Sequence, residues 1–129
     1  MRYLLDTNIL IDLSGPRYSD IFFKEILRQS NSQFFVHIVS IAEYMSGAGK
    51  TEEIFLRGWI ESGELHVIFW DDYEDAIRVG SLRRETKLSL PDVMIISACQ
   101  NQEVTLLTHD QELMKRAKAF ISVRDPMNG

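Results

Sequence analysis

The sequence is poor in the residues that mark secreted, fibrous or membrane proteins. Among 129 residues there are one cysteine, three prolines and seven glycines. The lone Cys99 cannot form an internal disulfide, which excludes a disulfide-stabilised scaffold and leads us to expect a reducing, cytosolic setting. No apolar segment approaches the roughly 18 residues of a membrane helix, and no secretory signal is apparent. Without repeats or Pro/Gly-rich linkers, we expect a single domain over residues 1–129.

Basic residues are also in the minority. The chain has 14 Lys and Arg against 19 Asp and Glu, for a formal charge of −5 at pH 7. This balance argues against binding nucleic acid over a broad surface, because phosphates would be repelled. Positive charge nevertheless gathers in two segments, which contain Arg78, Arg83, Arg84 and Lys87, and Lys115, Arg116 and Lys118. A solvated helix face is the default interpretation of each segment, and contact with phosphates is the alternative.

The rest of the composition, 45% hydrophobic and 26% charged, is that of a globular domain with a sizeable core. Apolar and β-branched runs predict strands over 2–5, 33–39, 64–70, 104–108 and 120–123. Apolar residues at helical spacing predict helices over 19–30, 40–47, 51–62, 71–87, 91–102 and 111–118. In the helix over 71–87, Tyr73, Ile77 and Leu82 should face the core, and Pro91 should open the helix over 91–102. Strands that alternate with helices predict an α/β fold with a mostly parallel sheet covered on both faces.

Acidic residues follow the predicted strands, at the sheet edge where α/β proteins bind their ligands. Asp6 ends the first strand in "LLDTN", Glu43 follows the second strand in "VSIAEYMSG", and Asp110 follows the fourth strand in "LLTHD". Asp92 opens the helix that leads into the fourth strand. The fold should therefore bring these four carboxylates to one edge of the sheet.

Each of these acids also has a purely structural explanation. Asp6 and Asp110 suit helix caps, Asp92 would complement a helix dipole, and Ser40 with Glu43 fits the S-x-x-E pattern of a capping box. Caps, however, do not need to converge, and like charges brought together repel one another. Ligands of Mg²⁺ or Mn²⁺ must converge, and these cations prefer carboxylate oxygens. The combination therefore favours a cation site over four independent caps.

Four segments together resemble the acidic motifs of PIN-domain nucleases, particularly VapC-type toxins. They are "LLDTNILIDL", "VSIAEYMSG", "LSLPDVMIISACQ" and "VTLLTHDQEL", and they match in order and spacing over essentially the whole chain. The resemblance implies a three-layer α/β/α fold with a five-stranded, mostly parallel sheet. It also implies Mg²⁺- or Mn²⁺-dependent cleavage of RNA, an antitoxin that blocks the site, and a homodimer.

The same resemblance assigns roles to individual residues. The catalytic, metal-binding quartet would be Asp6, Glu43, Asp92 and Asp110. Thr7, Asn8 and Thr108 would orient the acids and water, and Glu112 is the substitute for Asp110 because the last motif varies within the family. Cations held in this way would activate a water for attack on a phosphodiester.

Three other functional classes remain as alternatives. A phosphatase with an aspartyl nucleophile would carry D-x-D after the first strand, but position 8 is Asn. A phospho-acceptor receiver domain would need an acceptor Asp after a middle strand and a lysine after the fifth, and neither is evident. A PIN-like scaffold would bind RNA or protein without cutting, although it has no need of clustered carboxylates.

The histidines and the cysteine add little. His37 and His66 lie in strand-like runs without metal-ligand spacing, so we expect core or surface histidines. His109 lies beside the predicted site, where solvent exposure is as plausible as a role. Cys99, on an apolar helix, should be buried and inert.

Overall fold

Five short parallel strands form the centre of the structure. The computed structural model describes residues 1–15 and 31–126, so the predicted helix over 19–30 lies outside the described residues. All strand pairs are parallel, and the strand order is β3-β2-β1-β4-β5. The strands are β1 (Arg2–Leu5), β2 (Gln33–His37), β3 (Leu65–Ile68), β4 (Thr105–Leu107) and β5 (Val123–Arg124). The predicted parallel α/β sheet is confirmed.

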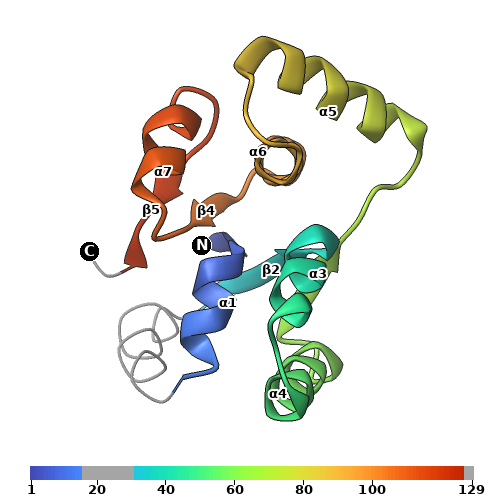
Figure 1. Ribbon diagram of the computed structural model, residues 1–129, viewed down its shortest axis with the longest axis vertical. Coiled ribbons are helices and arrows are strands. Elements are labelled where there is room, and N and C mark those ends of the chain that lie inside the picture. The colour runs from blue at the N-terminus through green and yellow to red at the C-terminus, as the bar shows by residue number, and fades with distance from the viewer. Residues whose placement is uncertain (16–30, 127–129) are drawn as a thin grey trace.

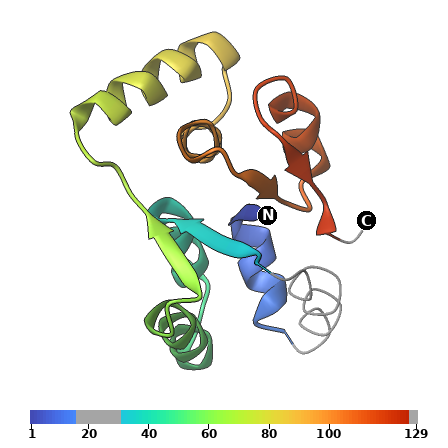
Figure 2. The same cartoon turned by 180° about the vertical axis from the view of Figure 1, so that it is seen from behind.

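Helices cover both faces of this sheet (Figure 1). They are α1 (Thr7–Leu13), α3 (Ile38–Ser46), α4 (Lys50–Glu61), α5 (Tyr73–Thr86), α6 (Leu90–Gln102) and α7 (Gln111–Ala117). The side chains of α1, α3 and α4 pack on one face, and those of α5, α6 and α7 pack on the other. Figure 2 shows the arrangement of these helices from behind. None of the described helices is long and apolar enough to cross a membrane.

Alternation along the strands divides the core into these two layers. Tyr3 and Leu5 join the cluster beneath α1, α3 and α4, while Leu4 between them joins the cluster beneath α5, α6 and α7. Phe34 and Phe35 on β2 divide in the same way. Because both faces of the sheet are covered, the strands read as continuous apolar runs in the sequence.

Several predicted boundaries need correction. The short helix α1 was not predicted. Strand β2 ends at His37 rather than at residue 39, and α3 begins two residues earlier than predicted. Strand β5 begins at Val123 rather than at residue 120, because Phe120 and Ile121 donate backbone hydrogen bonds to Ala117 and so prolong the turn after α7. Pro91 is the second residue of α6, which begins at Leu90.

The predicted core face of α5 was wrong for Tyr73 and Ile77 and right for Leu82, which packs against the core. Tyr73 is 72% exposed and Ile77 is 56% exposed, whereas Val79 is buried and Leu82 is half-buried. Helix α5 packs against α6 rather than directly on the sheet, so its buried stripe is narrow. The spacing of apolar residues alone could not identify which side of α5 packs against α6.

The strand order places a topological switch point between β1 and β4. The chain progresses from β1 through β2 to β3 on one side of β1, and then crosses over to β4 and β5 on the other side. In open α/β sheets the connections on either side of such a point turn to opposite faces, which leaves a crevice at the carboxyl ends of the strands. Asp6 and Thr108 are the first residues beyond these two strand ends.

Candidate active site at the switch point

Asp6 lies where β1 passes into α1. Leu5 pairs with Leu107 across the sheet, and the backbone N–H of Asp6 continues this pairing by donating to the Leu107 carbonyl at 3.0 Å. The Asp6 side chain is the N-cap of α1, since its Oδ1 accepts from the Thr7 N–H at 2.8 Å. The capping role is therefore real, but it uses only one of the two carboxylate oxygens.

The other oxygen of Asp6 belongs to a polar network centred on Thr108. The Thr108 hydroxyl, fully buried, donates to Asp6 Oδ2 at 2.8 Å and accepts from Asn8 Nδ2 at 3.2 Å. Asn8 Nδ2 also lies 3.4 Å from Asp6 Oδ2, and Asn8 Oδ1 accepts from the His109 N–H at 3.1 Å. Thr108 and Asn8 thus hold the Asp6 carboxylate in one orientation, from positions about a hundred residues apart in the chain.

Asp110 is fixed by the start of α7. Its Oδ1 accepts from the Leu113 N–H at 3.0 Å, and its own N–H donates to the Thr108 hydroxyl at 3.1 Å. The side chain is exposed, and so is that of Glu112 in the first turn of the same helix. The capping explanation of Asp110 is confirmed, while one of its carboxylate oxygens is not used by the cap.

The capping explanation of Glu43 was wrong. Helix α3 is capped by His37, whose Nδ1 accepts from the Val39 N–H at 3.0 Å, so Ser40 lies inside the helix and is buried. Glu43 instead accepts a hydrogen bond from the Thr7 hydroxyl at 3.0 Å. This contact directs the Glu43 carboxylate towards the N-terminus of α1, where Asp6 lies.

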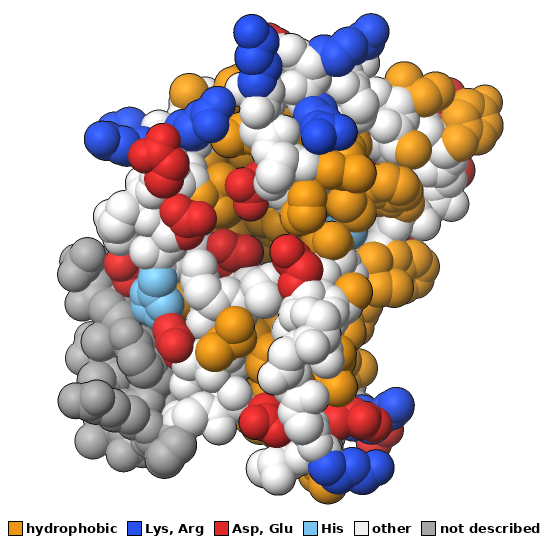
Figure 3. All heavy atoms as spheres, viewed as in Figure 1, with side chains coloured by type: hydrophobic (Ala, Val, Ile, Leu, Met, Phe, Trp, Pro, Cys, Tyr) orange, Lys and Arg blue, Asp and Glu red, His pale blue; other side chains and the backbone are white. Residues whose placement is uncertain are grey.

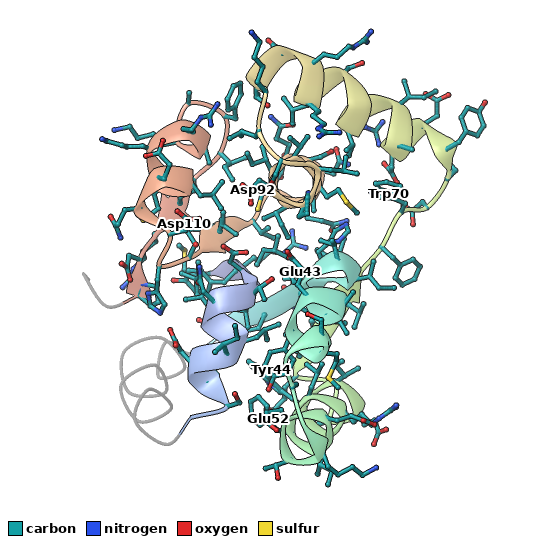
Figure 4. All side chains as sticks on the ribbon, viewed as in Figure 1. Glu43, Tyr44, Glu52, Trp70, Asp92 and Asp110 are labelled. Carbon is teal, nitrogen blue, oxygen red and sulfur yellow. The ribbon has the colours of Figure 1, made fainter. Side chains whose placement is uncertain are left out.

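Asp92 lies in the first turn of α6 without being its cap. That position belongs to Ser89, whose Oγ accepts from the Asp92 N–H at 3.3 Å. The Asp92 side chain is half-buried. In Figure 4, Glu43 on α3, Asp92 on α6 and Asp110 at the start of α7 lie around the upper end of α1.

The electrostatics link these four carboxylates. Burial raises the pKa of Asp6 above its ordinary range, and the negative charges of Asp92 and Glu43 raise it further. Hydrogen bonds from Thr108 and Thr7 oppose this shift. The pKa of Asp92 is likewise raised, first by burial and then by the charges of Asp110 and Glu43. Each buried acid therefore feels like charges from other elements, as expected where carboxylates converge.

This arrangement suits a hard divalent cation, although it is not a closed metal cage. Within residues 1–15 and 31–126, no three His, Cys, Asp or Glu side chains form a ready-made ligand group. The donors present are carboxylate oxygens, with the Thr108 and Asn8 side chains behind Asp6. Mg²⁺ commonly binds through one or two carboxylates and retains several waters, so an open set of acids fits its chemistry.

Sequence reasoning missed the contacts of His109. Its Nδ1 lies 2.8 Å from Asp125 Oδ1, and its Nε2 lies 2.8 Å from Asp12 Oδ2. Gln111 Nε2 also donates to Asp125 Oδ2 at 3.0 Å. His109 therefore joins the turn after β4 to α1 and to the end of β5. No local signal could have revealed this, because the three side chains come from distant parts of the sequence.

Neither of the other two histidines nor the cysteine belongs to the site. His37 is buried as a helix cap, His66 is exposed, and Cys99 is buried on α6, where burial raises the pKa of its thiol. These positions agree with the sequence-based expectation of a core histidine, a surface histidine and an inert thiol.

Comparison with known proteins places this geometry in a family. The PIN domain profile matches residues 3–119. A chain of a toxin–antitoxin complex from Klebsiella pneumoniae is 31% identical, with a TM-score of 0.69 and coverage of 96% of this chain and 97% of that one. No curated protein sequence matches significantly.

More distant structures share the fold. VapBC2 of Rickettsia felis, bound to a promoter DNA fragment, is 21% identical with a TM-score of 0.73, covering 97% of this chain and 98% of that chain. VapBC-1 of nontypeable Haemophilus influenzae is 19% identical, also with a TM-score of 0.73, covering 98% and 99%. At these identities the likeness establishes the fold alone.

Proposed function

Because the chain belongs to the PIN-domain family, we propose that it is a Mg²⁺- or Mn²⁺-dependent endoribonuclease and the toxin of a VapBC-type toxin–antitoxin pair. The main support is the convergence of Asp6, Glu43, Asp92 and Asp110 from four different elements at the switch point. Two of them have raised pKa values, in part because the others are negatively charged. Acids that served only as helix caps, or that lay singly on the surface, would have no reason to lie close enough to repel one another.

The chain's own residues divide the work of such a site. Asp6, Glu43, Asp92 and Asp110 would hold one or two cations. A divalent cation supplies Lewis acidity to a phosphodiester and its attacking water, and offsets the negative charge that would repel RNA. Thr108 and Asn8 keep Asp6 Oδ2 in a fixed orientation, and Thr7 holds Glu43 near it. No protein nucleophile is required.

The proposal includes two protein partners. The Klebsiella pneumoniae chain is part of a toxin–antitoxin complex, and two VapBC structures share its fold. We therefore expect a cognate antitoxin that blocks the acidic site, and a homodimer of this chain. The substrate would be cellular RNA, which places the activity in the cytoplasm.

A cleavage assay tests the nuclease proposal. Purified protein is incubated with total cellular RNA in Mn²⁺ or Mg²⁺, with and without EDTA, beside the variant Asp92→Asn. Cleavage that requires the cation and the Asp92 carboxylate is expected. Cleavage that persists in EDTA would refute the metal-dependent mechanism. Metal-independent binding of RNA, without cleavage of any transcript, would favour the non-catalytic scaffold.

A further inference from the structure

The two basic segments of the sequence meet in the folded structure. Arg83, Arg84 and Lys87 lie at the C-terminal end of α5, and Lys115, Arg116 and Lys118 lie at the C-terminal end of α7. We call these side chains the basic rim. The guanidinium Nη2 of Arg116 donates to the backbone carbonyl of Thr86 at 2.9 Å, which connects the two helix ends.

The basic rim borders the acidic site. Figure 3 shows Lys and Arg side chains along the top of the molecule, above a band of Asp and Glu side chains that crosses its centre. In the same view, α5 lies at the top and α7 at the upper left (Figure 1). Lys87 precedes Asp92 by a few residues, and the positive charge of Arg116 lowers the pKa of Asp92 against the effect of burial.

Helix dipoles explain only part of this clustering. Cations are favoured at helix C-termini by about 0.3–1 kcal/mol each, and both helix ends benefit. Dipoles do not require two helix ends to converge, and neighbouring cations repel one another as neighbouring acids do. Arg83 lies in the last turn of α5, and Lys87 is its C-cap residue, in a left-handed conformation just beyond the helix. Lys115 and Lys118, three residues apart at the end of α7, share one face of that helix, so the cations gather at the two helix ends.

The rim cations are not neutralised by carboxylates. All six rim side chains are exposed, and within residues 1–15 and 31–126 none of them has an ion pair. Glu85 on α5 and Glu112 on α7 are the acids nearest in sequence, and neither forms an ion pair with any residue that the structure describes. By contrast, Arg57 and Arg78 elsewhere on the surface pair with Glu53 and Asp75. The rim therefore retains its positive charge for an external anion.

We propose that the basic rim binds the phosphate backbone of the RNA beside the bond that is cut. This inference rests on the proposed nuclease function and identifies the residues that position its substrate. A protein with net charge −5 needs a local positive track to bring a polyanion to an acidic centre. Contacts to phosphates position a nucleic acid without reading its sequence, so the rim would contribute affinity rather than specificity.

RNA fits this surface better than an acidic protein does. The end of α5 leads directly to Asp92 at the start of α6, and Arg116 at the end of α7 contacts Thr86 and acts electrostatically on Asp92. A chain of phosphates could therefore run along the rim and into the acidic centre. The four carboxylates would repel both RNA and an acidic protein segment, but Mg²⁺ at such a site is commonly shared between carboxylates and substrate phosphates, which favours RNA. The two occupants are separated by the competition experiment below.

The test uses the double variant Lys115→Ala/Lys118→Ala. Its matched control, Lys50→Ala/Arg57→Ala, removes the same charge from α4, at the lower end of the molecule in Figure 1. Binding of a fluorescein-labelled single-stranded RNA of random sequence is measured by anisotropy in EDTA, at several salt concentrations. EDTA prevents metal-dependent cleavage, so the measurement does not depend on the nuclease proposal.

The rim variant should bind RNA about 20-fold more weakly than wild type near 0.1 M salt, and its salt slope should fall by about 1.4, as expected for two lost phosphate contacts. The control should bind within about twofold of wild type, and Lys115→Arg/Lys118→Arg should retain binding, because the positive charges remain. In a Mn²⁺ cleavage assay the rim variant should have a higher KM than wild type and nearly the same kcat.

Equal losses of RNA affinity in the rim variant and its control would overturn the inference. Cleavage of RNA by the rim variant with an unchanged KM would also overturn it. Competition by polyglutamate as effective as competition by unlabelled RNA would instead assign the rim to an acidic protein. Rim-dependent RNA binding without cleavage would support the rim and count against the nuclease proposal alone, so the two failures are distinguishable.

Discussion

The two sides of the candidate site differ in how the protein holds its acids. On the β1–β4 side, Asp6 receives hydrogen bonds from the Thr7 backbone, the Thr108 hydroxyl and the Asn8 amide. On the α3–α6 side, Glu43 is exposed and accepts a hydrogen bond from the Thr7 hydroxyl. The Asp92 side chain is hydrogen-bonded to Ser89. The same edge of the sheet thus combines a fixed carboxylate with two that are loosely held.

This difference separates orientation from charge. Hydrogen bonds from Thr108 and Thr7 partly compensate for the effect of burial on the pKa of Asp6. For Asp92, burial is opposed by the hydrogen bond with Ser89, and the charges of Asp110 and Glu43 raise the pKa further. On the β1–β4 side, the protein's own hydrogen bonds therefore fix the carboxylate. On the α3–α6 side, repulsion between the carboxylates remains, and a bound cation would relieve it. Substitutions on the two sides should accordingly have different effects on stability.

Asp92→Asn should have the largest effect on activity, because it removes a proposed ligand. We expect at least about a 100-fold loss of Mn²⁺-dependent cleavage, since even residues that only support metal ligands cost 10–100-fold. In EDTA at neutral pH the variant should melt at a higher temperature than wild type. A raised acid pKa means that the folded protein loses stability as pH rises from the ordinary Asp range through the raised value.

The pH dependence provides the internal control for this variant. Its advantage in melting temperature over wild type should shrink as the pH falls through the raised pKa of Asp92 and should vanish below the ordinary titration range of Asp, where Asp92 is protonated in both the folded and unfolded states. A variant that melts below wild type at every pH and still cleaves RNA would show that Asp92 is only a structural residue of α6.

Thr108→Val should damage the fixed side. The buried hydroxyl bonds Asp6, Asn8 and the Asp110 N–H, and its removal leaves these groups without that partner. We expect a loss of about 1–3 kcal/mol in the free energy of unfolding, and about 10–100-fold weaker Mn²⁺ binding by calorimetry. Thr108→Ser keeps the hydroxyl and should retain most of both. Equal losses in the two variants would point to packing of the methyl group.

Glu43→Gln tests the loosely held side with a smaller expected effect. Because the side chain is exposed and is not a helix cap, stability should change by less than about 0.5 kcal/mol, while Mn²⁺ affinity should fall by about tenfold. Ser40→Ala should also be nearly neutral in stability, since the buried Ser40 hydroxyl has no hydrogen-bond partner among the residues that the structure describes. A clear loss of stability in Ser40→Ala, measured by denaturant unfolding, would instead support the capping-box explanation of Ser40 and Glu43.

The smallest expected effect is at His37, outside the site. Burial lowers the pKa of His37, so the unfolded chain binds a proton that the folded protein resists. Stability should therefore fall as the pH drops below the ordinary histidine range, until the lowered value is reached. The variant His37→Asn can still cap α3. Its free energy of unfolding, measured in urea, should change less than that of wild type between neutral and mildly acidic pH. An unchanged pH profile would mean that another group titrates there.

Much of the fold was readable from local pattern. The apolar run of β1, the Pro-Asp start of α6 and the alternation of strands with helices each have a local cause in propensity and burial. Where the sequence-based assignment failed, the reason was tertiary. The S-x-x-E spacing around Ser40 was present, but β2 makes its last pair with β3 at His37 and Ile68, and the His37 side chain then caps α3, which begins at Ile38.

The sequence by itself determined the fold class and the order in which acidic residues follow the strands, because both depend on neighbouring residues along the chain. Tertiary structure alone decided that Thr108 bonds Asp6, that His109 joins Asp12 to Asp125, and that the ends of α5 and α7 share one rim. These contacts join residues far apart in the chain, and only the strand order and the crossover after β3 bring them within hydrogen-bonding distance.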